Sequence, residues 1–294
     1  MGQKFRGAGV ALITPFKKDS TIDFEALGEL VEDMISGGID FLVVLGTTAE
    51  TATLTAEEKK SVVDFVAEKN AGRLPIVVGA GGNNTREVVE GLKNIDAGKV
   101  DGILSVVPYY SKPTQEGIYR HFMQIAENSP VPIILYNVPG RTGMHMNAAT
   151  TIRLAEASDK FVAVKEASGD LTELAHILRD RPENFSVLSG DDGLTVPAIS
   201  LGADGVISVI ANGFPAKVAD MVHSAANGDF RKASAQHMQF LNLFNLLFVE
   251  GNPGGIKAAL NVKGKVENVL RLPLTPIGEI IYREITEEMK KING

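Results

Sequence analysis

Short runs of apolar residues alternate along the chain with longer stretches in which apolar residues recur every three or four positions. Continuous runs of this kind are typical of strands buried on both faces, as parallel strands are when helices cover them. In the first long stretch, Phe24, Leu27, Val31 and Met34 share one helical face, and Asp23 stands before them as an N-terminal cap. The apolar runs are GVALIT at 9–14, DFLVVL at 40–45, PIVVGA at 75–80, DGILSVV at 101–107, VPIILY at 131–136, FVAVK at 161–165, FSVLSG at 185–190 and DGVISVI at 204–210.

Eight strand-helix units in a chain of 294 residues predict an α/β protein with a (β/α)8 TIM barrel fold. A doubly wound open sheet is the alternative. The chain continues after the eighth unit with three stretches of helical pattern at 228–251, 254–264 and 273–294. No low-complexity linker precedes them. We therefore expect a catalytic barrel in residues 1–226 and a C-terminal three-helix extension, residues 227–294, packed on it.

Composition narrows the range of partners and compartments. The formal net charge is −7 and no basic run interrupts the chain, which disfavours a nucleic-acid partner. Cysteine is absent, which excludes disulfides and thiolate catalysis and fits a reducing compartment. No apolar run approaches the roughly 18 residues of a membrane helix, and Pro15 with the charged residues after it makes a poor signal peptide. We expect a cytoplasmic protein with no membrane partner.

Lys165 ends the sixth apolar run, and active sites of TIM barrels lie at the carboxyl ends of the strands. Burial at the barrel mouth disfavours the charged ammonium and leaves more free amine to attack a carbonyl, as Schiff-base chemistry requires. The alternative is a structural lysine that pairs with Glu166 or Asp191.

Other strand ends carry groups that suit a small carboxylate substrate. Thr47 and Thr48, in GTTAE at 46–50, offer hydroxyl and backbone N–H groups, although the same turn could be an ordinary helix cap. Tyr136 can relay a proton while neutral, or it can be a core aromatic residue. Arg141 can bind a carboxylate with two hydrogen bonds, or it can be a solvated surface charge.

A metal site is not expected, because the five histidines are scattered and none joins a carboxylate cluster at a strand end. The SGDD segment at 189–192 keeps two minor alternatives open. Its carboxylates could offer oxygen ligands to Mg²⁺. Together with GADGVIS at 202–208 it could also form a barrel phosphate site, although it lacks a glycine-rich helix start.

Five motifs in this order and at these spacings resemble the superfamily of dihydrodipicolinate synthases and N-acetylneuraminate lyases, which are pyruvate-dependent class I aldolases. The resemblance is greatest to the dihydrodipicolinate synthase family and extends from about Gly7 through the C-terminal helices, including EGNP at 250–253. The motifs are GTTAET at 46–51, PYYSKPTQEG at 108–117, YNVPGRTG at 136–143, VKEASGD at 164–170, and SGDD at 189–192 followed by GVISV at 205–209.

The resemblance implies a lyase that needs no cofactor. Its reaction would condense pyruvate with L-aspartate 4-semialdehyde through a lysine Schiff base and an enamine. The product would be 4-hydroxy-tetrahydrodipicolinate, on the diaminopimelate route of lysine biosynthesis. The alternative is a lyase for a sugar acid such as N-acetylneuraminate, which the intact VPGRTG at 138–143 disfavours. The family also implies a homotetramer, a dimer of dimers.

Four residues would be catalytic by this resemblance. Lys165 would form the imine with pyruvate, and Tyr136 would transfer protons during imine formation and cyclisation. Thr47 would connect Tyr136 to Tyr110 in a hydroxyl relay, with Tyr110 inserted into the site of the neighbouring subunit.

Four further residues would bind the substrates. Thr48 would hold the pyruvate carboxylate, Arg141 would receive the carboxylate of the semialdehyde, and Gly190 and Ile207 would line the site. Ala49 departs from the usual GTTGE motif. A small residue fits there unless the position requires positive φ, which alanine resists.

A lysine effector site is implied at Asn83, Glu87 and Tyr109. The helix after GTTAET carries Ala56 and Lys59, where strongly regulated members often have histidine or other polar residues. A second positive charge beside a lysine ligand is unfavourable. We therefore expect weak or no inhibition by lysine.

Overall fold

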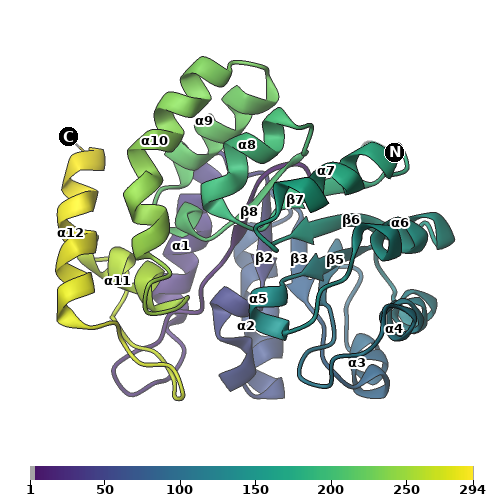
Figure 1. Ribbon diagram of the computed structural model, residues 1–294. Coiled ribbons are helices and arrows are strands. Elements are labelled where there is room, and N and C mark those ends of the chain that lie inside the picture. The colour runs from purple at the N-terminus through teal and green to yellow at the C-terminus, as the bar shows by residue number, and fades with distance from the viewer. Residues whose placement is uncertain (1–3, 294) are drawn as a thin grey trace.

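The computed structural model describes residues 4–293, and eight parallel strands form a closed barrel in them (Figure 1). Each strand pairs with the next along the chain, and β1 pairs with β8, so that no strand edge is left open. The predicted TIM barrel is confirmed, and the open doubly wound sheet is excluded. The strands are β1 Gly7–Ala11, β2 Phe41–Val44, β3 Ile76–Gly79, β4 Gly102–Val106, β5 Ile133–Asn137, β6 Phe161–Glu166, β7 Ser186–Ser189 and β8 Gly205–Ser208.

Amphipathic helices cover the outside of the barrel. The first begins after Asp23, whose side chain accepts a hydrogen bond from the Ala26 N–H, as the sequence predicts. The helices of this layer are α1 Phe24–Ser36, α2 Ala56–Asn70, α3 Thr85–Leu92, α4 Gln115–Asn128, α6 Ala148–Ala157, α7 Leu171–Asp180, α8 Thr195–Ser200 and α9 Pro215–Ala226. The short helix α5 Pro139–Thr142 lies in the loop after β5. Short 3-10 turns follow strands β2, β7 and β8 at η1 Thr47–Ala49, η2 Thr51–Thr53, η3 Asp192–Leu194 and η4 Ile210–Asn212.

The predicted C-terminal helices are present as α10 Phe230–Leu246, α11 Gly254–Val262 and α12 Glu279–Asn293. Figure 1 shows them gathered at one side of the barrel, and α10 packs on both α9 and α12. The division into 1–226 and 227–294 stays a prediction. In residues 4–293 no helix has both the length and the apolar character needed to cross a lipid bilayer.

Side chains fill the barrel interior below the carboxyl ends of the strands. Phe41 of β2 occupies the space beside Gly9 of β1, where a Cβ atom would lie 2.2 Å from the ring. Nearer the carboxyl ends of the strands, Tyr136, Leu188 and Ile207 belong to the same interior cluster. The reactive end of the barrel therefore has an apolar floor.

Candidate active site

Lys165 lies at the carboxyl end of β6, facing the barrel interior, and only 5% of the residue is exposed. Tyr136 of β5 is its strand partner, and the Lys165 ammonium lies 4.5 Å from the centre of the Tyr136 ring. No ion pair within residues 4–293 includes Lys165. The structural alternative, an ion pair with Glu166 or Asp191, is therefore not what the structure contains.

Glu166 points to the other side of β6 and connects it to β5. One carboxylate oxygen accepts a hydrogen bond from Asn137 Nδ2 at 2.8 Å, and the other accepts from the Ser168 N–H at 2.7 Å. Burial raises the pKa of Glu166, against the effect of these donors. Because Asn137 follows Tyr136 and Glu166 follows Lys165, this bond holds the two candidate catalytic residues side by side. The resemblance did not predict this pair.

Gly190 provides space for the Lys165 side chain. A Cβ atom on Gly190 would lie 3.0 Å from Lys165 Cε and 2.5 Å from Ala167 Cβ, both closer than carbon atoms normally approach. Ile207 contributes to the apolar interior cluster that includes Tyr136. The structure thus gathers four of the predicted residues, Lys165, Tyr136, Gly190 and Ile207, at the carboxyl end of the barrel interior.

The GTTAE segment forms a tight turn after β2. Leu45 and Glu50 have left-handed backbone conformations, with φ of 57° and 54°, whereas Ala49 does not. Alanine at position 49 is therefore compatible with the turn. Thr47 is exposed and Thr48 is buried, and they open the 3-10 turn η1. The first N–H groups of a helical turn have no acceptor inside the turn, so they are available to a ligand.

Two buried contacts join this turn to the C-terminal part of the chain. Thr48 Oγ1 accepts a hydrogen bond from Asn252 Nδ2 at 2.9 Å. The Glu50 carboxylate forms an ion pair with Lys257 of α11, and its other oxygen accepts from the Arg271 N–H at 3.0 Å. Neither contact could be predicted from the sequence, although Glu50 belongs to the GTTAE motif and Asn252 to the EGNP segment.

Tyr110 and Arg141 are both exposed. Tyr110 is 89% exposed with φ of 71°, and its N–H donates to the carbonyl of Thr142 at 3.4 Å. Within residues 4–293, no hydrogen bond joins the Tyr110 hydroxyl to Thr47 or Tyr136. Arg141 lies in the short helix α5 and takes part in no ion pair of the described chain. The single chain does not assemble the predicted hydroxyl relay.

The SGDD carboxylates are occupied by backbone donors. Asp192 Oδ2 accepts from the N–H groups of Val209 and Ile210 at 2.9 and 3.0 Å, and burial raises its pKa. Asp191 Oδ1 accepts from the Gly193 N–H at 2.8 Å. These bonds connect the loops after β7 and β8, and they leave the alternatives of a magnesium or phosphate site without support. In the described residues, no three His, Asp or Glu side chains come together as a set of metal ligands.

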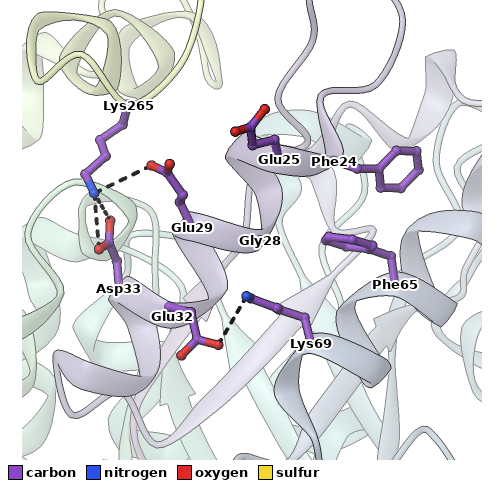
Figure 2. A pocket seen from close by; sticks show the side chains of 9 residues that line it. All are labelled: Phe24, Glu25, Gly28, Glu29, Glu32, Asp33, Phe65, Lys69 and Lys265. Atoms are coloured by element: carbon purple, nitrogen blue, oxygen red, sulfur yellow. Dashed lines mark hydrogen bonds and ion pairs between the residues drawn. The ribbon is translucent and has the colours of Figure 1, made fainter.

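A groove on the outer face of α1 and α2 lies apart from these residues (Figure 2). Phe24 and Phe65 line it together with charged side chains that pair with one another. Lys265 lies 2.9 Å from Asp33 Oδ2, and Lys69 lies 3.6 Å from a Glu32 oxygen. None of the predicted site residues lines this groove.

The predicted effector residues lie near the start of α3 and the end of β4. Asn83 and Glu87 are exposed, and Glu87 accepts a hydrogen bond from Asn84 Nδ2 at 2.9 Å. Tyr109 is 41% exposed. An effector role for these residues stays a prediction.

A model of the Dihydrodipicolinate synthetase family matches residues 4–292. The chain belongs to this family. A 4-hydroxy-tetrahydrodipicolinate synthase of Parabacteroides distasonis is 54% identical over 288 residues, which cover 98% of this chain and 97% of the relative. The resemblance found in the sequence motifs is confirmed.

Solved structures of dihydrodipicolinate synthases share the fold along almost the whole chain. The enzyme from Aquifex aeolicus is 43% identical, with a TM-score of 0.95 and 98% of each chain covered. The enzyme from Cyanidioschyzon merolae, solved with lysine bound, is 39% identical, with a TM-score of 0.95, 100% of this chain covered and 99% of the other.

Proposed function

We propose that the protein condenses pyruvate with L-aspartate 4-semialdehyde to form 4-hydroxy-tetrahydrodipicolinate, on the diaminopimelate route to lysine. The observation that carries the proposal is Lys165, a buried amine without an ion pair, lying against Tyr136 at the carboxyl end of a barrel of this family. A buried amine in such a place is suited to attack a keto group.

The first half of the reaction is the formation of an imine with pyruvate. Thr48 and the N–H groups at the start of η1 hold the carboxylate, and the Lys165 nitrogen bonds to the keto carbon. The keto oxygen leaves as water after receiving protons by way of the Tyr136 hydroxyl. The apolar floor of the barrel closes the site from below during this step.

The second half uses the imine as an electron sink. Loss of a methyl proton gives an enamine, because the nitrogen accepts the electron pair, and the enamine carbon then attacks the aldehyde carbon of the semialdehyde. Arg141 pairs with the carboxylate of this second substrate, which suits its exposed and unpaired guanidinium. The amine of the semialdehyde finally bonds to the imine carbon and displaces Lys165. The chemistry requires no cofactor.

Self-association completes the site in this proposal. The 89% exposed Tyr110 would enter the site of a neighbouring subunit and join Thr47 to Tyr136 there. A homotetramer built from two such dimers is the proposed assembly. Met238 and Leu241 of α10 are exposed apolar residues, and they are available for a further contact between copies.

Regulation by lysine is expected to be weak or absent. By the family resemblance Asn83, Glu87 and Tyr109 correspond to an effector site, and Lys59 of α2 would add a positive charge where a lysine ligand binds. A steady-state assay with added lysine tests this expectation, and sub-millimolar inhibition would contradict it.

Intact-protein mass spectrometry after borohydride reduction with pyruvate tests the imine step. We expect a pyruvyl adduct on the native protein and none on Lys165→Ala. The absence of an adduct on the native protein would remove the basis of the proposal. A coupled assay with L-aspartate 4-semialdehyde then identifies the second substrate, and pyruvate release from N-acetylneuraminate would identify the sugar-acid lyase instead.

A further inference from the structure

The segment around α11 reaches the turn after β2 through two polar contacts that are closed to solvent. Asn252 is 6% exposed and donates to Thr48 Oγ1, a residue 204 positions earlier. The Lys257 and Glu50 side chains are 0% exposed and form an ion pair with each other. The C-terminal layer therefore touches the turn that holds the pyruvate carboxylate in the proposed mechanism.

Glu50 requires these contacts because its backbone is strained. Its φ of 54° is unfavourable for a residue with a side chain. The carboxylate is held by Lys257 and by the Arg271 N–H, and the Glu50 carbonyl accepts from the Thr53 N–H at 2.9 Å and from Thr53 Oγ1 at 3.0 Å. Such a conformation persists only where surrounding contacts fix it.

Lys257 is enclosed by partners that orient its ammonium. Besides Glu50, it donates to the Val269 carbonyl at 3.0 Å and lies 4.1 Å from the centre of the Phe16 ring. Burial lowers the pKa of Lys257 to about 8, while the Glu50 carboxylate opposes this shift. Removing one member of such a pair leaves a buried charge without compensation, so the turn must rearrange.

Asn252 acts on Thr48 directly. Because Asn252 Nδ2 donates to Thr48 Oγ1, the hydroxyl hydrogen of Thr48 is left to donate to another oxygen. The carboxylate of pyruvate supplies such an oxygen. Asn252 thereby makes Thr48 a donor toward the substrate.

We propose that Lys257, Glu50 and Asn252 are positioning residues for pyruvate, which fix the turn after β2 so that Thr48 faces the carboxylate. This inference rests on the proposed function. It assigns part of pyruvate recognition to the C-terminal helical layer, beyond the residues at the strand ends.

Steady-state kinetics of full-length variants test the proposal. In Lys257→Met the KM for pyruvate should rise about 10- to 100-fold, because a shift of about 1 Å in a binding group costs up to about 100-fold. In Asn252→Ala it should rise about 2- to 10-fold, the effect of one hydrogen bond. The KM for the semialdehyde should change less than about twofold in both, since that substrate is held by a different loop.

Lys265→Met is the matched control. Lys265 also pairs with a carboxylate across the boundary between the C-terminal layer and the barrel, but its partner Asp33 lies on the outer face of α1 (Figure 2). Its KM for pyruvate should be unchanged. The double variant Glu50→Gln with Lys257→Met removes both buried charges, and it should recover part of the thermal stability that Lys257→Met loses.

All kinetics are measured at a temperature where circular dichroism shows each variant to be folded. If Lys257→Met does not fold, Asn252→Ala, which leaves no buried charge, decides the question. An equal rise of both KM values, or a KM for pyruvate within about twofold of the native value in the folded variants, would overturn the inference. Measurements on the native protein distinguish failure of this inference from failure of the proposed function. If the native protein forms no pyruvyl adduct and shows no turnover, the proposed function itself fails.

Discussion

Gly190→Ala places a methyl group where the Lys165 side chain passes. The new Cβ would lie 2.5 Å from Ala167 Cβ and 3.0 Å from Lys165 Cε. Gly190 does not have positive φ, so the effect comes from lack of space and not from backbone strain. The backbone around it cannot yield easily, because the Gly190 N–H donates to the Glu166 carbonyl at 2.7 Å and the Ala167 N–H donates to the Asn137 carbonyl at 2.9 Å.

The expected magnitude follows from these distances. Carbon atoms approach to about 3.5 Å, so Lys165 Cε must move by roughly 0.5 Å and Ala167 by roughly 1 Å. Overpacking of this kind costs about 1–3 kcal/mol of stability. Since a displacement of about 1 Å at a reacting group costs up to about 100-fold in rate, kcat/KM for pyruvate should fall roughly 10- to 100-fold.

Gly193→Ala, in the same loop, is the control. Its Cβ would meet the Asp191 carboxylate at 3.3 Å, a side chain that can shift, and no other atom closer than 4.0 Å. For both variants we measure the rate at which the borohydride-trapped adduct forms, the steady-state kcat/KM for pyruvate, and unfolding by urea. A folded Gly190→Ala protein that forms the imine at the native rate would refute the idea that Gly190 makes room for Lys165.

Three further predictions concern other parts of the molecule. Arg141→Ala should leave imine formation intact and raise the KM for the semialdehyde about 10- to 100-fold, the value of a charged hydrogen bond; unchanged semialdehyde kinetics would contradict the assignment. Tyr110→Phe removes the hydroxyl of the proposed relay and should lower kcat by about 100-fold or more. Thermal stability should not change, because the side chain is 89% exposed in one chain. Burial lowers the pKa of His121 to about 4. As the pH falls from about 6.5 to 4, the unfolded chain therefore binds a proton at His121 before the native state does, and the free energy of unfolding decreases by up to about 3 kcal/mol. Urea unfolding at pH 7 and 4.5 should show a smaller decrease for His121→Gln than for the native protein.

The positions of the strands and of the reactive lysine could be predicted from the sequence because both depend on local pattern. A buried parallel strand requires an uninterrupted apolar run, and the barrel then fixes which end carries the chemistry. Lys165 and Tyr136 end such runs, and the structure pairs them as neighbours on β5 and β6. The same reasoning predicted the three C-terminal helices from their periodicity.

The bounds of β1 could not be predicted from the apolar pattern. The run at 9–14 predicted a strand that begins later and extends further than the observed Gly7–Ala11. Leu12 and Ile13 are apolar and buried, but the Ile13 N–H donates to Asn212 Oδ1 at 3.1 Å, outside the sheet. A strand ends where its N–H groups find another acceptor, and here that acceptor lies 199 residues away.

Long-range contacts of this kind also determine the turn that receives pyruvate in the proposed mechanism. GTTAE at 46–50 has the sequence of an ordinary helix start, and nothing local indicates that Glu50 is buried with left-handed φ. Its partner Lys257 lies in an apolar helical stretch, where a lysine is normally expected to reach solvent. The pairing of Glu50 with Lys257 cannot be predicted from either residue alone, because it depends on how α11 packs on the barrel. If the turn receives pyruvate as proposed, substitutions in the C-terminal layer will change substrate affinity without touching a strand end, because Asn252 and Lys257 contact the turn directly.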